Sequence, residues 1–473
     1  MPATQTRPKP ASGHPQPAAA AAPVTLESLF AVRCDDPIAG AFPGKRAVHP
    51  FVNMVPVSRD RVVPLWAELF DRPRTGRGVA YVHVPFCENH CLFCGFYQNA
   101  WRDDAGGAYV DAIAAQLRAF ADTPAAEGPP LQAVYLGGGT PTALSAPDLA
   151  RLIGALREYL PLVPDCEITL EGRIQSFGAE KACAAFGAGA TRISLGVQSF
   201  ADHVRRPLGR RAPRSEILRS LRDLVALDRG AVVIDLMYGL PRQTPADVAA
   251  DVHLCADLGL DGLDLYSLNL IPGTPLLSAV EKGKLTPSTV AEMGAFFTAG
   301  EEAAEAEGWR RITTTHWQGT LRERNVYNLA VKTGADCLAF GAGAGGFLGG
   351  HNFRITSDLS RFQAAAGSGT CLTDAMMRQK STVAVQNAIK YGMERGALDP
   401  RPVDRALADL AGTDAISFSA HAAPLLEQWI AAGLMRPYHR FLRLTRAGRF
   451  WQVAMTGRLL DWLGQHPNLG DPT

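Results

Sequence analysis

Three closely spaced cysteines are the residues of this 473-residue chain best suited to chemistry. Cys87, Cys91 and Cys94 follow the pattern C-x3-C-x2-C. Cysteine thiolates hold iron–sulfur clusters, and a four-iron cluster normally takes four of them. Three thiolates therefore leave one iron of a [4Fe-4S] cluster without a protein ligand. That iron is free to bind a small molecule through its amino and carboxylate groups.

A structural zinc site is the alternative interpretation of the same residues. It would use the three thiolates together with His83 or His90. Zinc ligands usually come as two separated pairs, and the chain has no second C-x2-C. The cluster is therefore favoured. The other six cysteines are scattered and are interpreted as small buried hydrophobic residues.

Composition excludes several classes of protein. The 47 Lys and Arg residues balance 46 Asp and Glu residues, so no electrostatic footprint indicates nucleic acid or an anionic membrane as a partner. No apolar run approaches the length of a membrane span. The N-terminus lacks the charged-then-apolar layout of a signal peptide. With no disulfide framework in the cysteine pattern, we expect a cytoplasmic protein.

Short apolar runs typical of strands alternate with amphipathic helical patterns between residues 79 and 272. The strands are expected at Val79–Val84, Ala133–Leu136, Glu167–Leu170, Thr191–Leu195, Ala231–Leu236 and Gly262–Leu268. The clearest helices are expected at Ala108–Ala121, Ala146–Leu160, Ser215–Leu227 and Ala246–Leu258, the last with Thr244 as its N-cap. Strands that alternate with helices predict a parallel sheet.

Each predicted strand ends in a distinctive group. These are Cys87, Gly137 to Thr140, Glu171, Gln198, Asp235 and Asn269. In a parallel barrel the carboxyl ends of the strands meet on one face, which is the functional face. Taken alone, the glycine run would be a tight βα turn. In this setting its glycines also allow the backbone to approach a ligand closely.

Longer motifs stand in a fixed order along the chain. They are Tyr81-x-His-x-Pro-Phe-Cys87, Leu136-Gly-Gly-Gly-Thr-Pro-Thr142, Glu171, Arg192 to Phe200, Leu208-Gly-Arg210, Asp235 to Thr244 and Phe340-Gly-x-Gly. With them, residues 81–346 resemble the HemN-like subgroup of the radical S-adenosylmethionine (SAM) superfamily. That subgroup contains oxygen-independent coproporphyrinogen oxidase, the HemW haem chaperones and class C methyltransferases. The resemblance implies an α/β fold, a partial (β/α)6 TIM-like barrel with an N-terminal extension and a C-terminal α+β winged-helix-like cap.

The resemblance also implies two SAM sites beside the cluster. Tyr81, Gly138 and Glu171 would hold the first SAM, the glutamate accepting hydrogen bonds from ribose hydroxyls. The pocket of the second SAM is matched by Phe93, Gly139, Thr140, Gln198, Arg210, Asp235 and Asn269. Arg210 suits a carboxylate, and Asp235 suits an ammonium or ribose group. Taken alone, they would be a surface arginine and a helix-capping aspartate. No catalytic residue is assigned.

Departures from the subgroup narrow the resemblance. Phe96 occupies the position of a fourth cysteine in the oxidase, and Gly172-Arg173 replaces the N-P turn that usually follows the glutamate. Arg324-Asn-Val-Tyr-Asn328 replaces the H-N-x-x-Y-W of the chaperones. With the leader from Phe30 to Pro56, these features are most similar to the anaerobic haem-degradation methyltransferases of the HutW/ChuW type, the anaerobilin synthases.

This family resemblance implies a radical SAM C-methyltransferase of class C type acting on haem. One SAM would yield a 5′-deoxyadenosyl radical, a second would donate its methyl carbon to a meso carbon, and the ring would open to a methylated linear tetrapyrrole with iron release. An electron donor such as a flavodoxin is expected. The alternatives are oxygen-independent coproporphyrinogen III oxidase, and a HemW-like haem chaperone without turnover.

Four regions are expected along the chain. They are a disordered leader (1–24), an N-terminal extension (25–75), the radical SAM core barrel (76–310) and a HemN-like C-terminal region (311–473). In the last region we expect a helix at Ala423–Ala432, short strands near Leu434 and at Phe441–Leu444, and Thr445 as an N-cap. We interpret this part as a lid over the barrel mouth.

Two groups of residues are candidates for contact with a flat tetrapyrrole. Phe96, Tyr97 and Trp101 would stack on the ring, or would simply pack beneath the cysteine loop. Lys45, Arg46 and His49 in the leader would bind propionates if residues 30–57 cross the barrel mouth. Alternatively, these basic residues form a solvated turn.

Overall fold

One long, curved sheet organises the protein. The computed structural model describes residues 24–45, 54–102, 105–411 and 416–466. Within them, thirteen strands hydrogen-bond in the order β1 (Met54–Pro56), β15 (Thr373–Gln379), β14 (His351–Ile355), β13 (Gly345–Leu348), β12 (Asp336–Phe340), β2 (Gly78–Val84), β5 (Leu131–Gly138), β6 (Leu162–Gly172), β7 (Arg192–Gln198), β8 (Ala231–Tyr238), β9 (Gly262–Ser267), β11 (His316–Gln318) and β10 (Arg310–Arg311).

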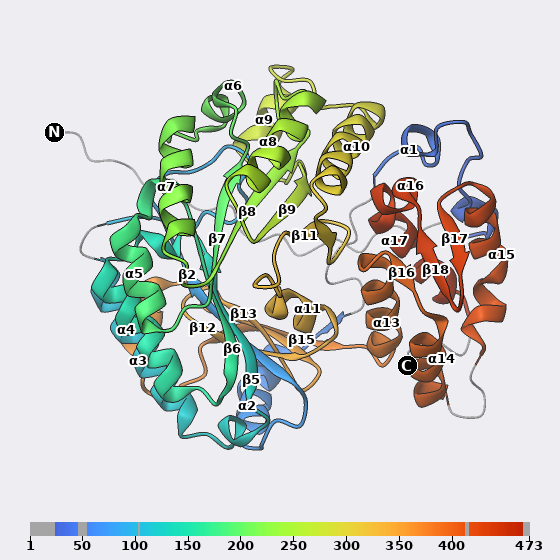
Figure 1. Ribbon diagram of the computed structural model, residues 1–473. Coiled ribbons are helices and arrows are strands. Elements are labelled where there is room, and N and C mark those ends of the chain that lie inside the picture. The colour runs from blue at the N-terminus through green and yellow to red at the C-terminus, as the bar shows by residue number, and fades with distance from the viewer. Residues whose placement is uncertain (1–23, 46–53, 103–104, 412–415, 467–473) are drawn as a thin grey trace.

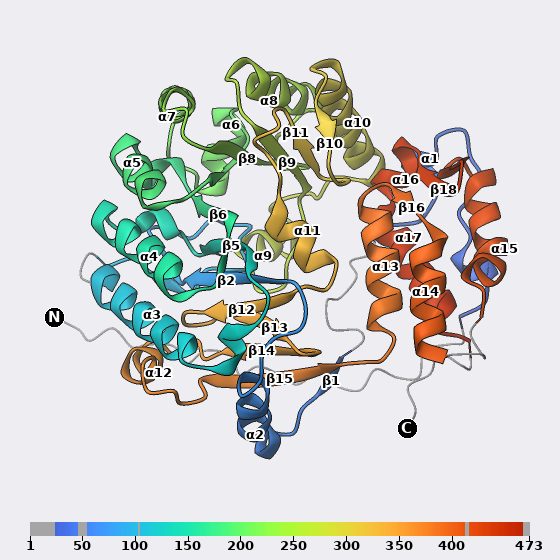
Figure 2. The same cartoon turned by 60° about the horizontal axis from the view of Figure 1, so that its bottom comes forward.

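The middle of this sheet is the predicted parallel barrel. Strands β2, β5, β6, β7, β8 and β9 run parallel and match the six predicted strands, except that Thr191 precedes β7 and Leu268 follows β9. Their outer face is covered by helices (Figures 1 and 2), namely α3 (Ala105–Ala121), α4 (Ala146–Tyr159), α5 (Ala179–Ala188), α7 (Arg214–Ala226), α8 (Pro245–Asp257) and α10 (Val290–Ala306). Thr244 caps α8 as predicted, in a reciprocal capping box with Asp247. The partial α/β barrel is therefore confirmed.

The sheet extends beyond the six predicted strands on both sides. A seventh parallel strand, β12, pairs with β2, and β13, β14, β15 and β1 continue from it in antiparallel fashion. On the other side, β11 and β10 add to β9. The expected boundary at residue 310 thus falls inside strand β10, and residues 311–379 continue the main sheet.

Shorter elements lie between these strands and helices. They are η1 (Glu27–Leu29), α1 (Pro37–Gly40), α2 (Arg59–Phe70), η2 (Pro124–Glu127), η3 (Pro141–Ala143), η4 (Ile174–Ser176), α6 (Asp202–Arg205), η5 (Arg206–Leu208), α9 (Pro275–Glu281), α11 (Val326–Lys332) and α12 (Leu359–Ala365). Helix α11 contacts β2 and β5, where Tyr327 packs against Tyr81 and Tyr135. None of the described helices is long and apolar enough to cross a lipid bilayer.

A second unit of helices and a small sheet follows the barrel. It comprises α13 (Val383–Glu394), β16 (Ala397–Leu398), α14 (Pro400–Ala411), α15 (Phe418–Ala431), β17 (Met435–Tyr438), β18 (Phe441–Leu444), α16 (Arg446–Phe450) and α17 (Gln452–Leu463). The predicted helix, strands and Thr445 cap are present, with a left-handed Gly433 after α15. The unit stands at the side of the barrel, where α16 contacts α10 and α13 contacts α11 (Figure 1).

The segment of residues 30–45 joins this C-terminal unit to the barrel. The backbone of Ala31 exchanges two hydrogen bonds with the side-chain amide of Gln428 in α15, at 2.9 and 2.6 Å. The indole of Trp451 donates to the carbonyl of Pro37 at 2.9 Å. Helix α1 contacts both α10 and α16, so residues from the start and the end of the chain share one interface.

A buried carboxylate fixes the contact between α10 and the C-terminal unit. Glu301 is 1% exposed and pairs with Arg311, with Arg449 at 2.7 Å and with Arg446 at 3.4 Å. A buried carboxylate needs such partners because its desolvation cost is several kcal/mol. Glu301 therefore joins three segments: α10, β10 and α16.

We predict that Glu301→Gln lowers the free energy of unfolding by about 3 kcal/mol, because three partly buried guanidiniums lose their shared anion. Urea unfolding followed by tryptophan fluorescence measures this effect, since Trp429 and Trp451 lie in the C-terminal unit. The matched control is Glu302→Gln, which removes one exposed pair with Arg446 and should change stability by less than about 1 kcal/mol. Equal effects of the two substitutions would contradict the role given to Glu301.

Candidate active site

The cysteine loop lies at the carboxyl end of β2. Cys87 ends β3 (Phe86–Cys87), which pairs in parallel with β4 (Asn99–Ala100) and so closes the loop at its base. Cys87 and Cys91 are each 1% exposed, whereas Cys94 is half-buried. The loop is anchored further by Leu92, whose N–H donates to the carbonyl of Leu208 at 3.3 Å.

Hydrogen-bond donors surround the cysteine sulfurs. The Thr140 hydroxyl lies 3.4 Å from Cys87 Sγ, and Nη2 of Arg173 lies 3.7 Å from the same sulfur. The backbone N–H of Phe96 donates to Cys94 Sγ at 3.4 Å. Donors of this kind stabilise thiolate ligands of iron–sulfur clusters and tune their potentials. The donor set therefore fits a [4Fe-4S] cluster on Cys87, Cys91 and Cys94.

The single-ion zinc alternative finds no support in the described residues. No group of three or more His, Cys, Asp or Glu side chains among them is arranged to hold one metal ion. Each candidate histidine has one ring nitrogen within hydrogen-bond distance of another group, whereas Nε2 of His83 is buried without a partner among the described residues. Nδ1 of His83 lies 2.9 Å from the Tyr81 hydroxyl, and His90 stacks on Tyr97 with ring centroids 4.5 Å apart. Cluster thiolates bind three different irons, so they need not converge on one point.

The glycine run at the end of β5 has no room for side chains at Gly138 and Gly139. Gly138 has φ +109°, and a Cβ at this position would lie 2.5 Å from the His83 ring. A Cβ on Gly139 would lie 2.4 Å from the carbonyl oxygen of Phe86. The backbone of the run thus lies directly against the strand that leads to Cys87, where a side chain would disrupt the packing.

Two carboxylates predicted to bind SAM lie inside the barrel close to each other. Their side chains retain some exposure because they line the interior space. Burial and the neighbouring Asp235 raise the pKa of Glu171 to about 8, against a hydrogen bond from Gly138. Burial and the neighbouring Asp264 raise the pKa of Asp235 to about 7. A cationic or hydroxyl-bearing ligand would favour the charged form of both groups.

The remaining predicted SAM residues divide into two groups. Gln198 ends β7 with φ +72°, an unusual left-handed conformation, and its amide lies near Gly196 beside Arg210. The guanidinium of Arg210 donates to the carbonyl of Gly196 at 2.9 Å and lies 5.7 Å from the Phe93 ring centroid. Asn269 follows β9 and is exposed. The structure therefore brings Phe93, Gln198 and Arg210 together and leaves Asn269 at the rim.

A chain of buried charged side chains runs from Asp235 through His316 to Arg192. Asp264 pairs in register with Asp235 and lies 2.8 Å from Nδ1 of His316. Nε2 of His316 lies 2.8 Å from Glu323, which accepts a hydrogen bond from Arg192 at 2.8 Å. Burial opposes protonation of His316, but Asp264 and Glu323 outweigh it and raise its pKa to about 9. Burial is also outweighed at Glu323, where Arg192 and His316 lower the pKa to about 2.

Sequence reasoning missed this chain of charges and the contact of Arg173 with Cys87. Arg173 was visible as a departure from the family motif, but nothing local indicated its partner. Arg192 lay within a recognised motif, whereas His316 and Glu323 had no signal of their own. Their pairing depends on β11, a short strand that adds to the sheet edge.

The aromatic candidates have separate environments. Phe96 is 70% exposed. Tyr97 stacks on His90, and Trp101 packs edge-on against Phe86 with centroids 5.8 Å apart. Ordinary packing therefore accounts for Tyr97 and Trp101, while Phe96 is left available to a ligand.

Of the basic candidates in the leader, only Lys45 is described. Arg46 and His49 lie outside the described residues. The Lys45 side chain is exposed overall, but its Nζ lies 3.3 Å from the Tyr238 hydroxyl and 3.8 Å from the Phe450 ring centroid. A role for these residues in propionate binding stays a prediction.

Comparisons with known proteins agree with this geometry. The profile of the radical SAM superfamily matches residues 81–255. An anaerobilin synthase from Escherichia coli O157:H7 is 41% identical over 90% of this chain and 93% of its own length. This chain belongs to the anaerobilin synthase family of radical SAM proteins. A haem chaperone HemW from Escherichia coli K12 is 27% identical over 80% of this chain and 94% of its own length.

Among solved structures, the radical SAM enzyme coproporphyrinogen III oxidase (HemN) from Escherichia coli is similar. It superposes with a TM-score of 0.72 at 21% identity, covering 88% of this chain and 96% of that one. This likeness shows that the chain has the HemN fold.

We predict that replacing Cys87, Cys91 or Cys94 with alanine abolishes the broad visible absorbance of the anaerobically reconstituted protein. Each substitution removes one of three thiolates, and iron and sulfide analysis should fall in parallel with the absorbance. Cys183→Ala is the matched control because Cys183 is exposed on α5. Zinc without iron or sulfide in the wild-type protein would refute the cluster.

A second prediction concerns pH and His316. Its pKa in the folded protein, about 9, lies above the unfolded value of 6.5, so its contribution is complete below pH 6.5 and is lost as pH rises through about 9. That contribution is on the order of 3 kcal/mol. We expect His316→Gln to be less stable than wild type at pH 6 in urea unfolding, with a gap that narrows by pH 9.5.

The control for this prediction is His253→Gln, which removes an exposed pair with Glu307. Such pairs contribute about 0–1 kcal/mol. A gap between wild type and His316→Gln that stayed constant from pH 6 to 9.5 would show that the charge of His316 contributes nothing.

Proposed function

We propose that this protein opens haem in the absence of oxygen to a methylated linear tetrapyrrole and releases iron. The observation that carries the proposal is the 41% identity with an anaerobilin synthase over 93% of that protein's length. The cysteine loop and the donors on its sulfurs support the same chemistry. The proposal includes class C methyl transfer, two SAM molecules in one site, a flavodoxin as electron donor and a cytoplasmic location.

The residues of this chain divide the work by position. When bound, the cluster and SAM supply the radical that starts the reaction. Gly138 and Gly139 let the backbone lie directly beside the cysteine loop, because a side chain there would strike His83 or Phe86. Glu171 and Asp235 accept hydrogen bonds from bound ribose or ammonium groups. Because burial raises the pKa of each carboxyl, these donors favour its charged form when they bind.

Arg210 binds a carboxylate in this proposal. Its guanidinium is fixed by the carbonyl of Gly196 and lies beside Phe93, while its Nε is buried without a partner. Exposed Phe96 offers an apolar face next to Cys94 for the tetrapyrrole ring.

Two other functions compete. Coproporphyrinogen oxidation shares the fold, but Phe96 stands where the oxidase has its fourth cysteine. A haem chaperone without turnover would not need the set of Gln198, Arg210 and Asp235, which the barrel holds at the mouth and interior. Both alternatives are therefore less well supported than ring opening.

The test is mass analysis of the tetrapyrrole formed from haem and methyl-deuterated SAM under strict anaerobiosis with a reductant. We expect deuterium in an opened tetrapyrrole, and release of iron in equal amount. The Cys87→Ala variant is the control and should form no product. In a parallel incubation with coproporphyrinogen III in place of haem, its decarboxylation together with no deuterated product from haem would assign the protein to the oxidase reaction. Haem binding without product from either tetrapyrrole would assign it to the chaperones.

A further inference from the structure

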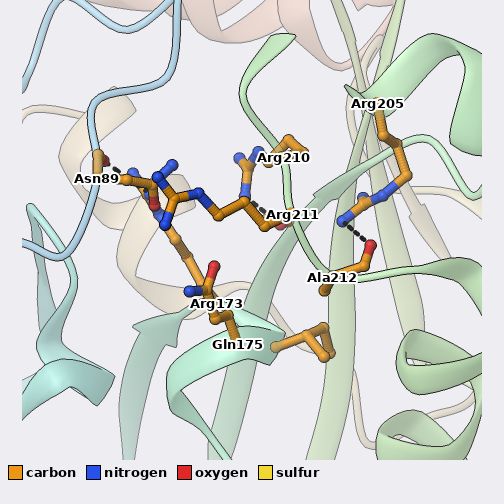
Figure 3. A pocket seen from close by; sticks show the side chains of 9 residues that line it. Asn89, Arg173, Gln175, Arg205, Arg210, Arg211 and Ala212 are labelled. Carbon is orange, nitrogen blue, oxygen red and sulfur yellow. Dashed lines mark hydrogen bonds between the residues drawn. The ribbon is translucent and has the colours of Figure 1, made fainter. Parts of the chain in front are cut away.

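A small pocket rich in arginine opens between the loops that follow β6 and β7. It encloses about 290 Å³, part of it open to solvent, beside Asn89 of the cysteine loop. Its polar lining comes chiefly from Asn89, Gln175, Arg173, Arg205, Arg210 and Arg211. Figure 3 shows the side chains of Arg173, Arg210 and Arg211 gathered on the side of Asn89, with Arg205 apart from them next to Ala212.

These arginines form no close ion pair with a described carboxylate, although Asp235 and the thiols of Cys91 and Cys94 lie near Arg210. Within the described part of the chain, none of the four forms an ion pair within 4 Å, although arginines elsewhere in the barrel do so, as Arg192 does with Glu323. Guanidinium groups that lie together repel one another, and removal from water raises that cost. A pocket that concentrates positive charge in this way is suited to an anion.

The four arginines do not play the same part. Arg205 is 3% exposed and donates to the carbonyls of Val197, Ser199 and Ala212, so it holds the loop after β7 in shape. Arg210 bonds only to the carbonyl of Gly196 and leaves its buried Nε without a partner. Arg205 and Arg210 therefore line the pocket as fixed side chains.

Arg173 and Arg211 are the donors nearest the cysteine loop. Arg173 bonds to the backbone and side-chain oxygens of Asn89 at 3.1 and 3.0 Å, which aims its guanidinium along the loop. Arg211 is exposed, and its side chain forms no hydrogen bond with another described residue. Figure 3 shows the side chain of Arg211 turned toward Arg173 and Arg210, an arrangement that an anion between them would stabilise.

We propose that Arg173 and Arg211, next to Arg210, form a carboxylate site that binds a propionate of the tetrapyrrole substrate. The assignment rests on the proposed function. Paired guanidinium forks match the planar geometry of a carboxylate, and the pocket is too small to admit the ring itself. The ring would lie outside, toward exposed Phe96.

Two alternative roles for the pocket predict different outcomes. The pocket could serve the carboxylate of a SAM molecule, which has the same chemistry, or its positive charge could merely offset the cysteine thiolates. Arg173 contacts Cys87 Sγ, so a change at Arg173 alone does not separate these cases. Arg211 lines the pocket without a hydrogen bond or ion pair to a described residue, and it is therefore the deciding position.

The experiment measures dissociation constants of the anaerobically reconstituted full chain for haem, for haem dimethyl ester and for SAM. We expect Arg211→Ala and Arg173→Gln to weaken haem binding roughly ten- to a hundredfold, as loss of a charge-assisted hydrogen bond does. Wild type should bind the dimethyl ester about as weakly as the variants bind haem, and the variants should not weaken the ester further. SAM binding and iron content of Arg211→Ala should match wild type.

The matched control is Arg206→Ala, because Arg206 lies in the same loop but points to solvent and pairs with Asp202 at 3.6 Å. It should leave all three constants unchanged. Unaltered haem binding by Arg211→Ala, an equal loss for haem and its ester, or a loss confined to SAM would each overturn the propionate site. The proposed function fails separately, if wild type itself neither binds nor opens haem.

Discussion

The register of the curved parallel sheet is the constraint on which the site depends. Gly196, Asp235, Asp264 and His316 occupy one row across four neighbouring strands. Side chains alternate between the two faces of a strand, so a slip of one residue would turn this polar row outward into the helix layer. The same alternation directs Glu171 inward from β6. The packing of the apolar outer face against the helices therefore also determines which polar side chains face the barrel interior.

Charges on the inner face of the barrel form two groups, which differ in whether they pair with one another. In the first group, Asp264, His316, Glu323 and Arg192 pair with one another and hold β7, β9 and β11 together. In the second group, Glu171 repels Asp235, and Arg173 and Arg210 lie nearby without forming an ion pair within 4 Å to a described carboxylate. Buried charges that pair with one another usually stabilise the fold, whereas unpaired ones indicate a ligand site. The first group of described residues therefore belongs to the scaffold, and the second group belongs to the binding site.

Much of this arrangement could be predicted from the sequence because its signals are local. The three cysteines, the glycine run and the strand–helix alternation each lie within a few residues, and the structure has the predicted strands where they were expected. The contact of Arg173 with Cys87 joins residues 86 positions apart, and that of Arg192 with Glu323 joins residues 131 apart. Contacts between residues so far apart leave no recognisable spacing in a single sequence. Strands β12 to β15 were missed for a similar reason, because they are identified by the strands they pair with and not by a local pattern of apolar residues.

The joining of the leader to the last helices has a consequence for the order of events during synthesis. Ala31 emerges from the ribosome long before Gln428, the residue 397 positions later that completes its hydrogen bonds. The barrel strands, by contrast, mostly pair with neighbours in the chain and can assemble as they appear. The side of the barrel is therefore closed last, by both ends of the polypeptide at once. The interface between the barrel and the C-terminal unit therefore cannot form until the C-terminal helices have been made.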